Sequence, residues 1–491
     1  MYQSFAKKFS QTGEVTEINF PVVGVRGLPD AFFKEYVYFE NGERGVILNL
    51  KKELAEVLLL GATGVKMGEK VAKSGEPLKI PVSISALGKI ITPFGSEILG
   101  PYSKDPKVEF RSVDTAPPGL ETRRPIRSPL ICGIPAVDTL FPLGKGQREL
   151  VVGNRKTGKT TFLTSLLKGV AGDKTVVIYN LIASQKKEAF EIYEYAVSSH
   201  LSKFLIIASF AGESSAMVYF SPFCAMTYAE YFRDAGYDVV LVLDDMTTHA
   251  KYCREISLLA RGLPGRDSYP PDIFYTHARI LERAGNFSAG KKGQVSITCL
   301  PVAQTKENDF TDYIVSNLIG ITDGHLLFDE DEFSKGRRPA INYSLSVTRV
   351  GRQVQNALLG DVGRRALSFL TSEYAKSQTL SYFGSELTDY VRDNLDKGEK
   401  LEDFFNQSGT VLIPCEVQVV MCAMILNGYF KGETLIKMQF FKEVFVKNYL
   451  GDGRTSKMVN NIASVKDFEH LTNALLDNKL DLLESCKKAK T

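Results

Sequence analysis

The sequence predicts a multidomain chain with three parts: an N-terminal β-barrel of the six-stranded type, a central α/β domain and a C-terminal α-helical bundle. The chain has 491 residues, which is too long for one ordinary domain. Short β-rich runs fill the first part, apolar strands alternate with helical stretches from about residue 130, and strand signals stop after about residue 358. We therefore expect domains at residues 1–81, 82–358 and 359–491.

The composition is that of a globular protein without a strong electrostatic bias. Hydrophobic residues make up 44% and charged residues 24% of the chain, and the formal net charge is +3. This near balance gives no electrostatic case for nucleic-acid binding. No apolar run approaches the ~18–20 residues that span a bilayer, and the first residues, MYQSFAKKFSQTGE, lack the apolar core of a signal peptide. The 7 cysteines form no CxxC pair, which indicates reduced thiols in a cytosolic compartment.

The first part is expected to be a small barrel followed by a connector. The runs EVTEINFPVVGV, YVYFE, RGVILNL and AEVLLLG are rich in Val, Ile, Leu and Tyr, and turn sequences separate them at close intervals. The next segment, PYSKDPKVEFRSVDTAPPGLETRRPIRSP, is dense in proline and charge and predicts an extended connector.

The second part shows the alternation typical of a parallel sheet. Its short apolar runs are ELVVG, TVVIYNLI, FLIIASF, DVVLVLDD, VSITCLPVA and DGHLLFD. Helical stretches lie between them, so we expect a parallel sheet covered on both faces. The third part has helical periodicity in segments such as PCEVQVVMCAMIL and LIKMQFFKEVFVKNYL, which predicts a helical bundle.

A phosphate-binding motif lies in the central part. Residues 153–160, GNRKTGKT, fit the pattern GxxxxGK[ST], and the strand before and the helix after them argue against a chance glycine-rich turn. Glycines let backbone N–H groups curl around phosphates, and the helix N-terminus favours negative charge. Lys159 is expected to reach the β- and γ-phosphates, and the Thr160 hydroxyl to ligate Mg²⁺. The central part is therefore predicted to be a P-loop NTPase domain of the RecA-like type.

The ligand expected for this motif is Mg-ATP or Mg-ADP. The residues of the motif expected to contact it are Gly153, Asn154, Arg155, Lys156, Thr157, Gly158, Lys159, Thr160 and Thr161. The strand DVVLVLDD supplies a second metal ligand, because Asp244 at its C-terminal end is placed to hold Mg²⁺ through a water. An Asp at a strand end is common, so this assignment depends on its pairing with the P-loop.

Hydrolysis needs in addition a carboxylate that orients and deprotonates the attacking water. In this class of site the carboxylate follows the strand after the P-loop helix, which here is TVVIYNLI. Gln185 stands at that place, and an amide can position a water but cannot accept its proton. Glu188, three residues further on, stays an alternative in a shifted register. The sequence therefore predicts a chain that binds ATP and does not cleave it.

Three long passages resemble the α subunit of F-type ATP synthases and their F-type-like ATPase relatives. They are GIPAVDTLFPLGKGQRELVVGNRKTGKTT, LARGLPGRDSYPPDIFYTHARILERAG and YIVSNLIGITDGHLLFDEDEFSKGRRPAINYSLSVTRVGRQVQ, and the similarity extends from about Gly13 to Tyr429. The resemblance implies a non-catalytic, regulatory subunit that alternates with catalytic β-type subunits in an α3β3 hexamer around a γ-type shaft. It also implies a peripheral place on the cytoplasmic side of the cell membrane, with a membrane sector or other membrane-bound machinery as partner.

The resemblance assigns roles to single residues. Arg349 in SVTRVG matches the arginine that α subunits insert toward the γ-phosphate of the neighbouring β site, where such a finger stabilises charge in the transition state. An arginine at a strand end is otherwise more often part of a surface ion pair. Gln185 agrees with the family's glutamine, where the β type carries Glu. Arg338 and Pro339 match positions that line the adenine pocket, and Gln407 matches a glutamine that contacts the base.

Some positions depart from the family pattern. Asn154 and Lys156 replace the Asp and Gln of the usual GDRQTGKT, and the added positive charge still favours phosphate. Gly409 stands where a second adenine-contacting Gln is usual, so weaker base selectivity is expected. Only about a dozen residues precede the barrel, where the family usually has a longer helix that docks the peripheral stalk, and this argues against ordinary stator binding. The part after residue 430 also matches poorly.

Three functions stay open. The first is the finger-donating subunit of a rotary ATPase, which either makes ATP with proton transport or hydrolyses it to drive another machine, such as motility or surface-protein processing, as divergent motors of wall-less bacteria do. The second is a self-sufficient, secretion-type homohexamer, which needs a carboxylate in every copy and is disfavoured by Gln185. The third is an RNA-translocating hexamer, which needs basic and aromatic residues on its barrel. Acidic residues accompany the aromatic ones there, so no nucleic-acid partner is expected (Phe32, Phe33, Tyr36 and Tyr38 beside Asp30, Glu35 and Glu40).

Overall fold

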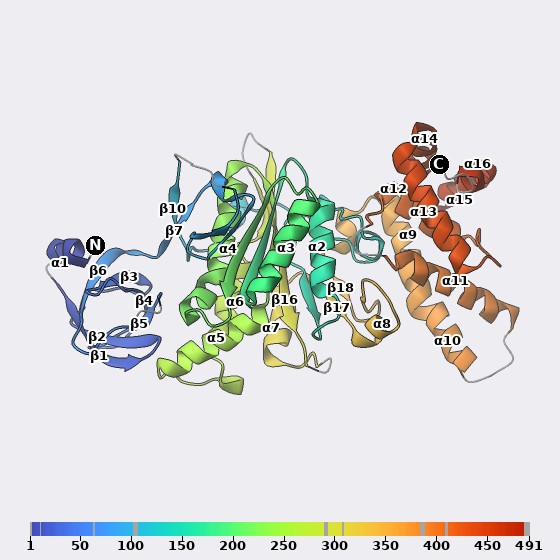
Figure 1. Cartoon of the computed structure of the whole chain (residues 1–491). Helices are drawn as coiled ribbons and strands as arrows, with labels where there is room; N and C mark the ends of the chain where they lie inside the picture. Colours follow the sequence, from blue (N-terminus) through green and yellow to red (C-terminus); the bar gives the residue numbers. More distant parts are fainter. Residues whose placement is uncertain are drawn as a thin grey trace. The chain divides into compact units, whose positions relative to one another are not determined.

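The chain folds into two compact units, and Figure 1 labels their helices and many of their strands. The first unit comprises residues 1–125, 171–305 and 309–322, and the second comprises residues 126–170, 306–308 and 323–491. The structure, a computed structural model, describes residues 2–9, 11–61, 64–101, 107–288, 293–306, 309–382, 388–407 and 411–485.

The first unit begins with a closed six-stranded barrel, as the sequence predicts. The strands pair in the order β1-β2-β5-β4-β3-β6, and β6 closes on β1. They are β1 (Gly13–Asn19), β2 (Val22–Arg26), β3 (Glu35–Phe39), β4 (Arg44–Leu50), β5 (Ala55–Leu59) and β6 (Lys70–Pro77). Alternate residues point inward, so Val37 and Phe39 are buried while Tyr36 and Tyr38 are only partly buried. Val, Ile, Leu and Phe side chains fill the interior, as in other small barrels.

A helix that the sequence analysis did not predict, α1 (Tyr2–Phe9), precedes the barrel and packs against β6. The Phe5 ring stacks on the Tyr38 ring with 5.0 Å between the centroids. Phe9 lies over Gly75, where a Cβ would come within 2.6 Å of the ring. A helix this short is marginal in isolation, so these aromatic contacts stabilise it and its local sequence does not reveal it.

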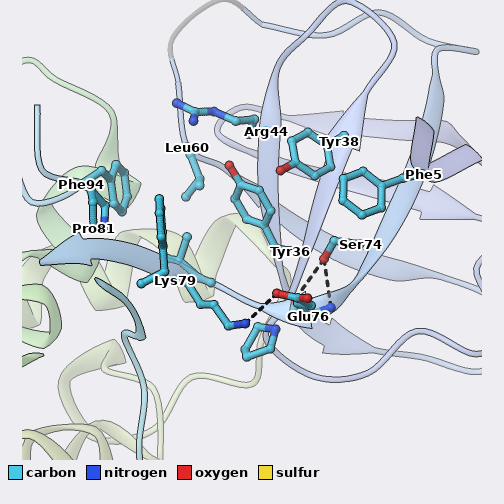
Figure 2. A pocket seen from close by; sticks show the side chains of 13 residues that line it. Phe5, Tyr36, Tyr38, Arg44, Leu60, Ser74, Glu76, Lys79, Pro81 and Phe94 are labelled. Atoms are coloured by element: carbon cyan, nitrogen blue, oxygen red, sulfur yellow. Dashed lines mark hydrogen bonds and ion pairs between the residues drawn. The ribbon is translucent and has the colours of Figure 1, made fainter. Parts of the chain in front are cut away.

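A cavity of about 540 Å³ lies beside this aromatic cluster in the first unit (Figure 2). Phe5, Tyr36 and Tyr38 line one side, and the Lys79 ammonium forms an ion pair with Glu76 at 2.7 Å. The Ser74 hydroxyl accepts from the Glu76 backbone N–H at 3.1 Å. The polar groups of this wall are thus paired with one another.

A twisted, mostly parallel sheet follows in the first unit, in the order β16-β14-β12-β13-β8-β9. Its strands are β8 (Lys89–Ile91), β9 (Glu97–Leu99), β12 (Thr175–Ser184), β13 (Phe204–Phe210), β14 (Asp238–Asp244) and β16 (Gln294–Gln304), with β15 (Gly285–Ser288) antiparallel to β16. The central strands are buried along nearly their whole length, which explains their continuous apolar sequences. Helices that pack on the sheet or beside it are α3 (Lys186–Ser198), α4 (Ser215–Ala235), α5 (Met246–Leu259), α6 (Ile273–Leu281) and α7 (Tyr313–Ile321).

The predicted connector contains a strand, which corrects the expectation of an extended linker there. β10 (Glu109–Ser112) pairs antiparallel with β7 (Lys79–Val82). No residue of β10 is buried, and Arg111 in it forms ion pairs with Glu109 and Asp234, each at 2.7 Å. A strand held by backbone pairing and surface charges lacks the apolar alternation on which sequence prediction depends.

In its described residues, the second unit contains three more strands, the helices α2 and α8, and the helices of the C-terminal part. β11 (Leu150–Gly153) is parallel to β17 (Gly324–Phe328), and β18 (Val347–Thr348) is antiparallel to β17. The helices are α2 (Lys159–Val170), α8 (Glu330–Ser334), α9 (Ala357–Ser368), α10 (Ala375–Tyr382), α11 (Asp389–Phe405), α12 (Cys415–Leu426), α13 (Leu435–Gly451), α14 (Gly453–Ala463), α15 (Phe468–Asp477) and α16 (Lys479–Ser485). The C-terminal part is helical, as predicted.

Helix α12 is the centre of the helical bundle. It is apolar on all sides because α9, α11, α13, α14 and α15 all pack against it. In the ranges that the structure describes, no helix has both the length and the apolar character that crossing a membrane requires.

Candidate nucleotide-binding site

The P-loop connects β11 to α2 in the second unit. Gly153 ends β11 with φ +153°, and a Cβ there would lie 2.2 Å from the Phe328 carbonyl oxygen, so the close approach of β17 requires glycine. Gly158, with φ +86°, ends the loop, and its carbonyl accepts the Phe162 N–H at 3.0 Å in the first turn of α2. The motif therefore has the strand–loop–helix context that its sequence predicts.

Lys159 lies across the loop that precedes it. Its ammonium donates to the carbonyl oxygens of Gly153 at 2.9 Å and Asn154 at 2.6 Å, and the residue is only 9% exposed. The Thr157 hydroxyl donates to the same Asn154 carbonyl at 2.8 Å. These contacts keep a positive charge at the N-terminus of α2, where the helix dipole also favours an anion.

The other predicted residues of the loop differ in exposure. Arg155, Lys156 and Thr161 are exposed, and Thr160 is partly buried. The Asn154 amide donates to the Glu330 carboxylate at 3.0 Å. This contact gives a physical reason for the departure from the family pattern, because an Asp in place of Asn154 would face Glu330 with like charge.

The structure brings the predicted adenine-pocket residues together in the second unit. The Gln407 N–H donates to the Arg338 carbonyl at 2.7 Å, and Pro339 follows Arg338 directly. The buried Gln407 amide donates to the carbonyls of Gly133, at 3.2 Å, and Val411. Gly409, the position expected to weaken base selectivity, lies outside the described residues.

Phe333 joins these residues to the P-loop, and sequence reasoning missed it. The Arg338 guanidinium lies 3.5 Å from the centroid of the Phe333 ring. The same ring lies 3.4 Å from the place of a Cβ on Gly158. Phe333 is the one aromatic residue in the segment DEDEFSKGRRP, which is the signal that could have drawn attention to it.

Asp244 and Gln185 are in the first unit, at the carboxyl ends of neighbouring strands. Asp244 ends β14, and the Tyr179 hydroxyl on β12 donates to its carboxylate at 2.8 Å. Gln185 follows β12, occupies the N-cap position of α3 without a side-chain cap bond, and is exposed. Because β12 and β14 are parallel neighbours, both residues lie at the edge where α/β sheets bind ligands.

Glu188, the alternative carboxylate, lies in the first turn of α3 and is partly buried. Burial raises its pKa, and the negative charges of Glu191 and Asp245 raise it further. Asp245 is the residue after Asp244 and caps α5 by accepting from the Thr248 N–H. The Glu188 carboxyl therefore lies near enough to Asp245, at this edge of the sheet, for the two negative charges to interact. Glu188 stays the alternative candidate for the carboxylate that position 185 lacks.

Arg349 lies at the opposite end of its strands from the P-loop of its own chain. It follows β18, is exposed, and donates its backbone N–H to the Asp323 carbonyl at 2.8 Å. The parallel register pairs Leu150 with His325 and Gly153 with Phe328, so the P-loop begins where these strands end. Five residues from Asp323 to Phe328 at about 3.3 Å each separate the two places by about 16 Å. The structure therefore does not bring Arg349 to the phosphate-binding loop of its own chain.

In the described parts of the chain, no group of three or more His, Cys, Asp or Glu side chains is arranged to hold a metal ion. The predicted metal ligands are instead one hydroxyl and one carboxylate, Thr160 and Asp244. Such a sparse set of oxygen donors fits Mg²⁺, which usually keeps several waters and binds substrate phosphates with one or two carboxylates.

Comparison with known proteins supplies family matches over most of the chain. The model of the ATP synthase alpha/beta family, nucleotide-binding domain, matches residues 133–348, and that of the ATP synthase alpha/beta chain, C terminal domain, matches residues 365–481. The second match extends beyond Tyr429, which corrects the expectation that the part after residue 430 matches the family poorly.

Three similar proteins carry the description ATP synthase subunit alpha. The protein of Sulfurovum sp. strain NBC37-1 is 37% identical over 422 residues, which cover 86% of this chain and 83% of the relative. The protein of Wolinella succinogenes is 33% identical over 460 residues, which cover 92% and 91%. The protein of Dictyoglomus thermophilum is 36% identical over 448 residues, which cover 90% and 86%.

Proposed function

This chain belongs to the ATP synthase alpha/beta family and is an alpha subunit of the F-type ATPases, and from that premise we propose a division of labour for it. It binds Mg-ATP or Mg-ADP at its own P-loop without turning the nucleotide over. It donates Arg349 to the catalytic site of a neighbouring β-type subunit in an α3β3 ring around a γ-type shaft.

The position of Arg349 is the observation that carries this proposal. The register of β11 and β17 leaves about 16 Å between the Arg349 backbone and the start of the P-loop of the same chain. A guanidinium that serves a γ-phosphate in trans has to lie away from its own phosphate site. Arg349 is also exposed, as a group that enters a partner's site must be.

Gln185 supports the non-catalytic half of the proposal. The chain carries an amide at the end of β12, next to the strand that ends in Asp244. An amide orients water but cannot take its proton, so chemistry at this chain's own site lacks a base. Glu188 is the residue that could replace it, and burial together with the charges of Glu191 and Asp245 raises its pKa.

The nucleotide site is assigned to the residues described above. Lys159 and the loop from Gly153 to Thr161 hold the phosphates, while Arg338, Pro339 and Gln407 line the base, with Phe333 between the two groups. Thr160 and Asp244 hold Mg²⁺, the latter through a water, and the ion neutralises phosphate charge when it is bound. The domain limits proposed for this arrangement are 1–81, 82–358 and 359–491.

The assembly is peripheral and lies on the cytoplasmic side of the membrane, where it works with a membrane sector or with other membrane-bound machinery. Two directions of work fit the same subunit: ATP synthesis coupled to proton transport, and ATP hydrolysis that drives motility or surface-protein processing. Identification of the chains that copurify with this subunit distinguishes them.

The experiment that tests the division of labour uses the purified full-length chain alone. We expect it to bind Mg-ATP, measured by equilibrium dialysis, with no steady release of phosphate. Gln185→Glu supplies a base but no finger from a neighbour, so the variant alone is also expected to stay far below the turnover of an assembled motor.

Steady phosphate release by the wild-type chain that disappears in Lys159→Ala contradicts the proposal and favours a self-sufficient homohexamer. Turnover of isolated Gln185→Glu at the rate of an assembled motor shows that the division of labour is wrong even if the wild-type chain is inactive.

A further inference from the structure

Three consecutive residues just before β11 contact the turn that carries Arg349 or the residues beside that turn: Gln147 contacts Thr348, Arg148 contacts Asp323, and Glu149 contacts Gln147 and Gly324. We call Gln147, Arg148 and Glu149 the bracket. The side chains of Gln147 and Glu149 are completely buried, whereas that of Arg148 is 25% exposed. Polar side chains are rarely buried so deeply unless they hold a specific partner, so the contacts of each member indicate what the bracket does.

Gln147 fixes the residue before Arg349. Its amide nitrogen donates to the Thr348 hydroxyl at 3.1 Å and to the Glu149 carboxyl at 2.7 Å, and its amide oxygen accepts the Gly144 N–H at 2.7 Å. The Thr348 hydroxyl in turn accepts the Gly351 N–H at 3.0 Å. The turn from 348 to 351, which contains Arg349, is thus closed on a hydroxyl that Gln147 holds.

Arg148 fixes the other side of the same turn. Its guanidinium makes two hydrogen bonds to the Asp323 carboxylate, at 3.0 and 2.7 Å, and its backbone carbonyl accepts the Asp323 N–H at 2.7 Å. The Asp323 carbonyl accepts the Arg349 N–H. The backbone on both sides of the Arg349 side chain therefore depends on the bracket.

Glu149 orients Gln147 from inside the protein. One of its carboxyl oxygens accepts from Gln147, and the other, also buried, has no hydrogen-bond partner. It packs against Gly324, where a Cβ would lie 2.5 Å from the carboxyl. Burial raises the pKa of Glu149 well above its usual range, while Gln147 and the positive charge of Arg349 lower it. The hydrogen bond from Gln147 is the contact through which Glu149 acts on the turn.

We propose that Gln147 and Glu149 are positioning residues for Arg349: Gln147 holds the turn through Thr348, and Glu149 holds Gln147. This inference rests on the proposed function of Arg349 as a finger for the neighbouring subunit. Displacement of a catalytic group by about 1 Å can lower a rate by about 10²-fold, so a buried support of this kind has a measurable effect on turnover.

The test compares variants of this chain in the complex assembled with its partner chains. Gln147→Ala is expected to lower kcat about 10- to 100-fold with KM close to wild type, because the finger acts on charge that develops in the transition state. Glu149→Ala is expected to lower kcat by a similar factor, because Gln147 then loses the carboxyl that orients it. Glu149→Gln retains an oxygen that accepts from Gln147, so this conservative variant should stay within a few-fold of wild type.

The matched control is Gln418→Ala. Gln418 is also a completely buried glutamine of the second unit, and it donates to Asp138 at 2.9 Å and to the Ile413 carbonyl at 2.8 Å. Its side-chain hydrogen bonds go to Thr139, Asp138 and Ile413 and not to the turn from 348 to 351, so Gln418→Ala is expected to lose about as much stability as Gln147→Ala while kcat stays near wild type. An equal loss of kcat in Gln418→Ala means that the effect of Gln147 is general destabilisation, which overturns the inference.

A double variant separates this inference from the proposal on which it rests. If Gln147 acts through Arg349, Gln147→Ala adds no further loss to Arg349→Ala, whereas losses that multiply contradict a positioning role. If Arg349→Ala alone retains activity, the finger itself is wrong. If Arg349→Ala is slow but Gln147→Ala is within a few-fold of wild type, the finger stands and the positioning role is wrong.

Thr348→Val keeps the inference testable if Gln147→Ala does not assemble. Valine has the shape of threonine but lacks the hydroxyl that Gln147 binds, so the same loss of kcat is expected. If both variants fail to assemble while Gln418→Ala assembles, the bracket is a folding element and the inference is overturned.

Discussion

The P-loop and the Arg349 turn lie at opposite ends of the same pair of strands, and they are held in different ways. The P-loop is closed on itself by contacts local in sequence: Lys159 and Thr157 bond to carbonyls of the same loop. The Arg349 turn depends on Gln147, about 200 positions upstream, and on Asp323. The comparison teaches that a site closed by neighbours in sequence can be recognised from a motif, whereas a site held by distant residues cannot.

The two ends also differ in what they are expected to serve. In the proposed division of labour, the P-loop binds the nucleotide of its own chain, and Arg349 acts on the nucleotide of a neighbour. A variant at either end should therefore affect one activity and spare the other, and the predictions below test this separation.

The largest effect is expected at Arg349. Arg349→Ala should lower turnover of the assembled complex by ~10³–10⁵, the contribution typical of an arginine finger. Arg349→Lys should be nearly as damaging, because an ammonium lacks the planar fork that spans two phosphate oxygens. The affinity of the isolated chain for Mg-ATP should stay near wild type, since Arg349 is remote from its own P-loop.

The measurement is ATP turnover of the reconstituted complex beside nucleotide binding by the lone chain. Turnover within a few-fold of wild type returns Arg349 to a surface role, in which an exposed ion pair contributes about 0–1 kcal/mol. If the isolated Arg349→Ala chain no longer binds ATP, Arg349 belongs to the nucleotide site of its own chain, and the two ends of the strands do not serve different nucleotides.

A smaller effect is expected at Lys159, and it concerns the chain's own nucleotide affinity instead of turnover at the neighbour's site. Lys159→Ala removes a charge-assisted hydrogen bond worth about 1.5–3 kcal/mol, so the chain's own affinity for Mg-ATP should fall about 10- to 100-fold. Turnover at the neighbour's site should change much less than in Arg349→Ala. Equilibrium dialysis of the isolated chain measures the first quantity, and turnover of the complex measures the second.

Lys168→Ala is the control for this change, because Lys168 lies in the last turn of the same helix α2, about 14 Å along the axis from Lys159. It should leave nucleotide affinity unchanged. Equal losses of affinity in both variants would mean that helix stability, and not the phosphate contact, accounts for the effect.

Sequence reasoning reached the local parts of the molecule and missed those that depend on tertiary contacts. The barrel, the parallel strands and the helical part follow from alternation and apolar runs, and all three are confirmed. Helix α1 was missed because aromatic contacts with the barrel stabilise it, and β10 was missed because it has no buried residue. The domain limits stay predictions.

In the candidate site, too, the residues of local motifs could be predicted, whereas those defined by tertiary contacts could not. The P-loop has its predicted strand and helix, and Arg338 and Gln407 meet through a hydrogen bond between their backbones. Phe333, which contacts both groups, belongs to no motif, and the bracket before β11 looks like ordinary polar residues in sequence. Their roles depend on register and burial, which only a three-dimensional arrangement defines. The roles of Gln185, Asp244 and Arg349 stay predictions.

The smallest effect sharpens the comparison without any activity measurement. His325 is on β17, beside the Arg349 turn, and its ring nitrogen Nε2 lies 2.8 Å from the Leu345 carbonyl. Burial lowers the pKa of His325, the carbonyl opposes this, and the positive charge of Arg349 lowers the pKa further. Removal of that charge in Arg349→Ala should therefore raise the pKa of His325 toward its usual value, whereas Lys159→Ala at the other end of the strands should leave it unchanged.

The chain has 5 histidines, so an NMR titration of imidazole-labelled protein can follow His325 once its signal is assigned with His325→Gln. An unchanged or lower pKa in Arg349→Ala would place the guanidinium away from β17, and then the bracket could not support it.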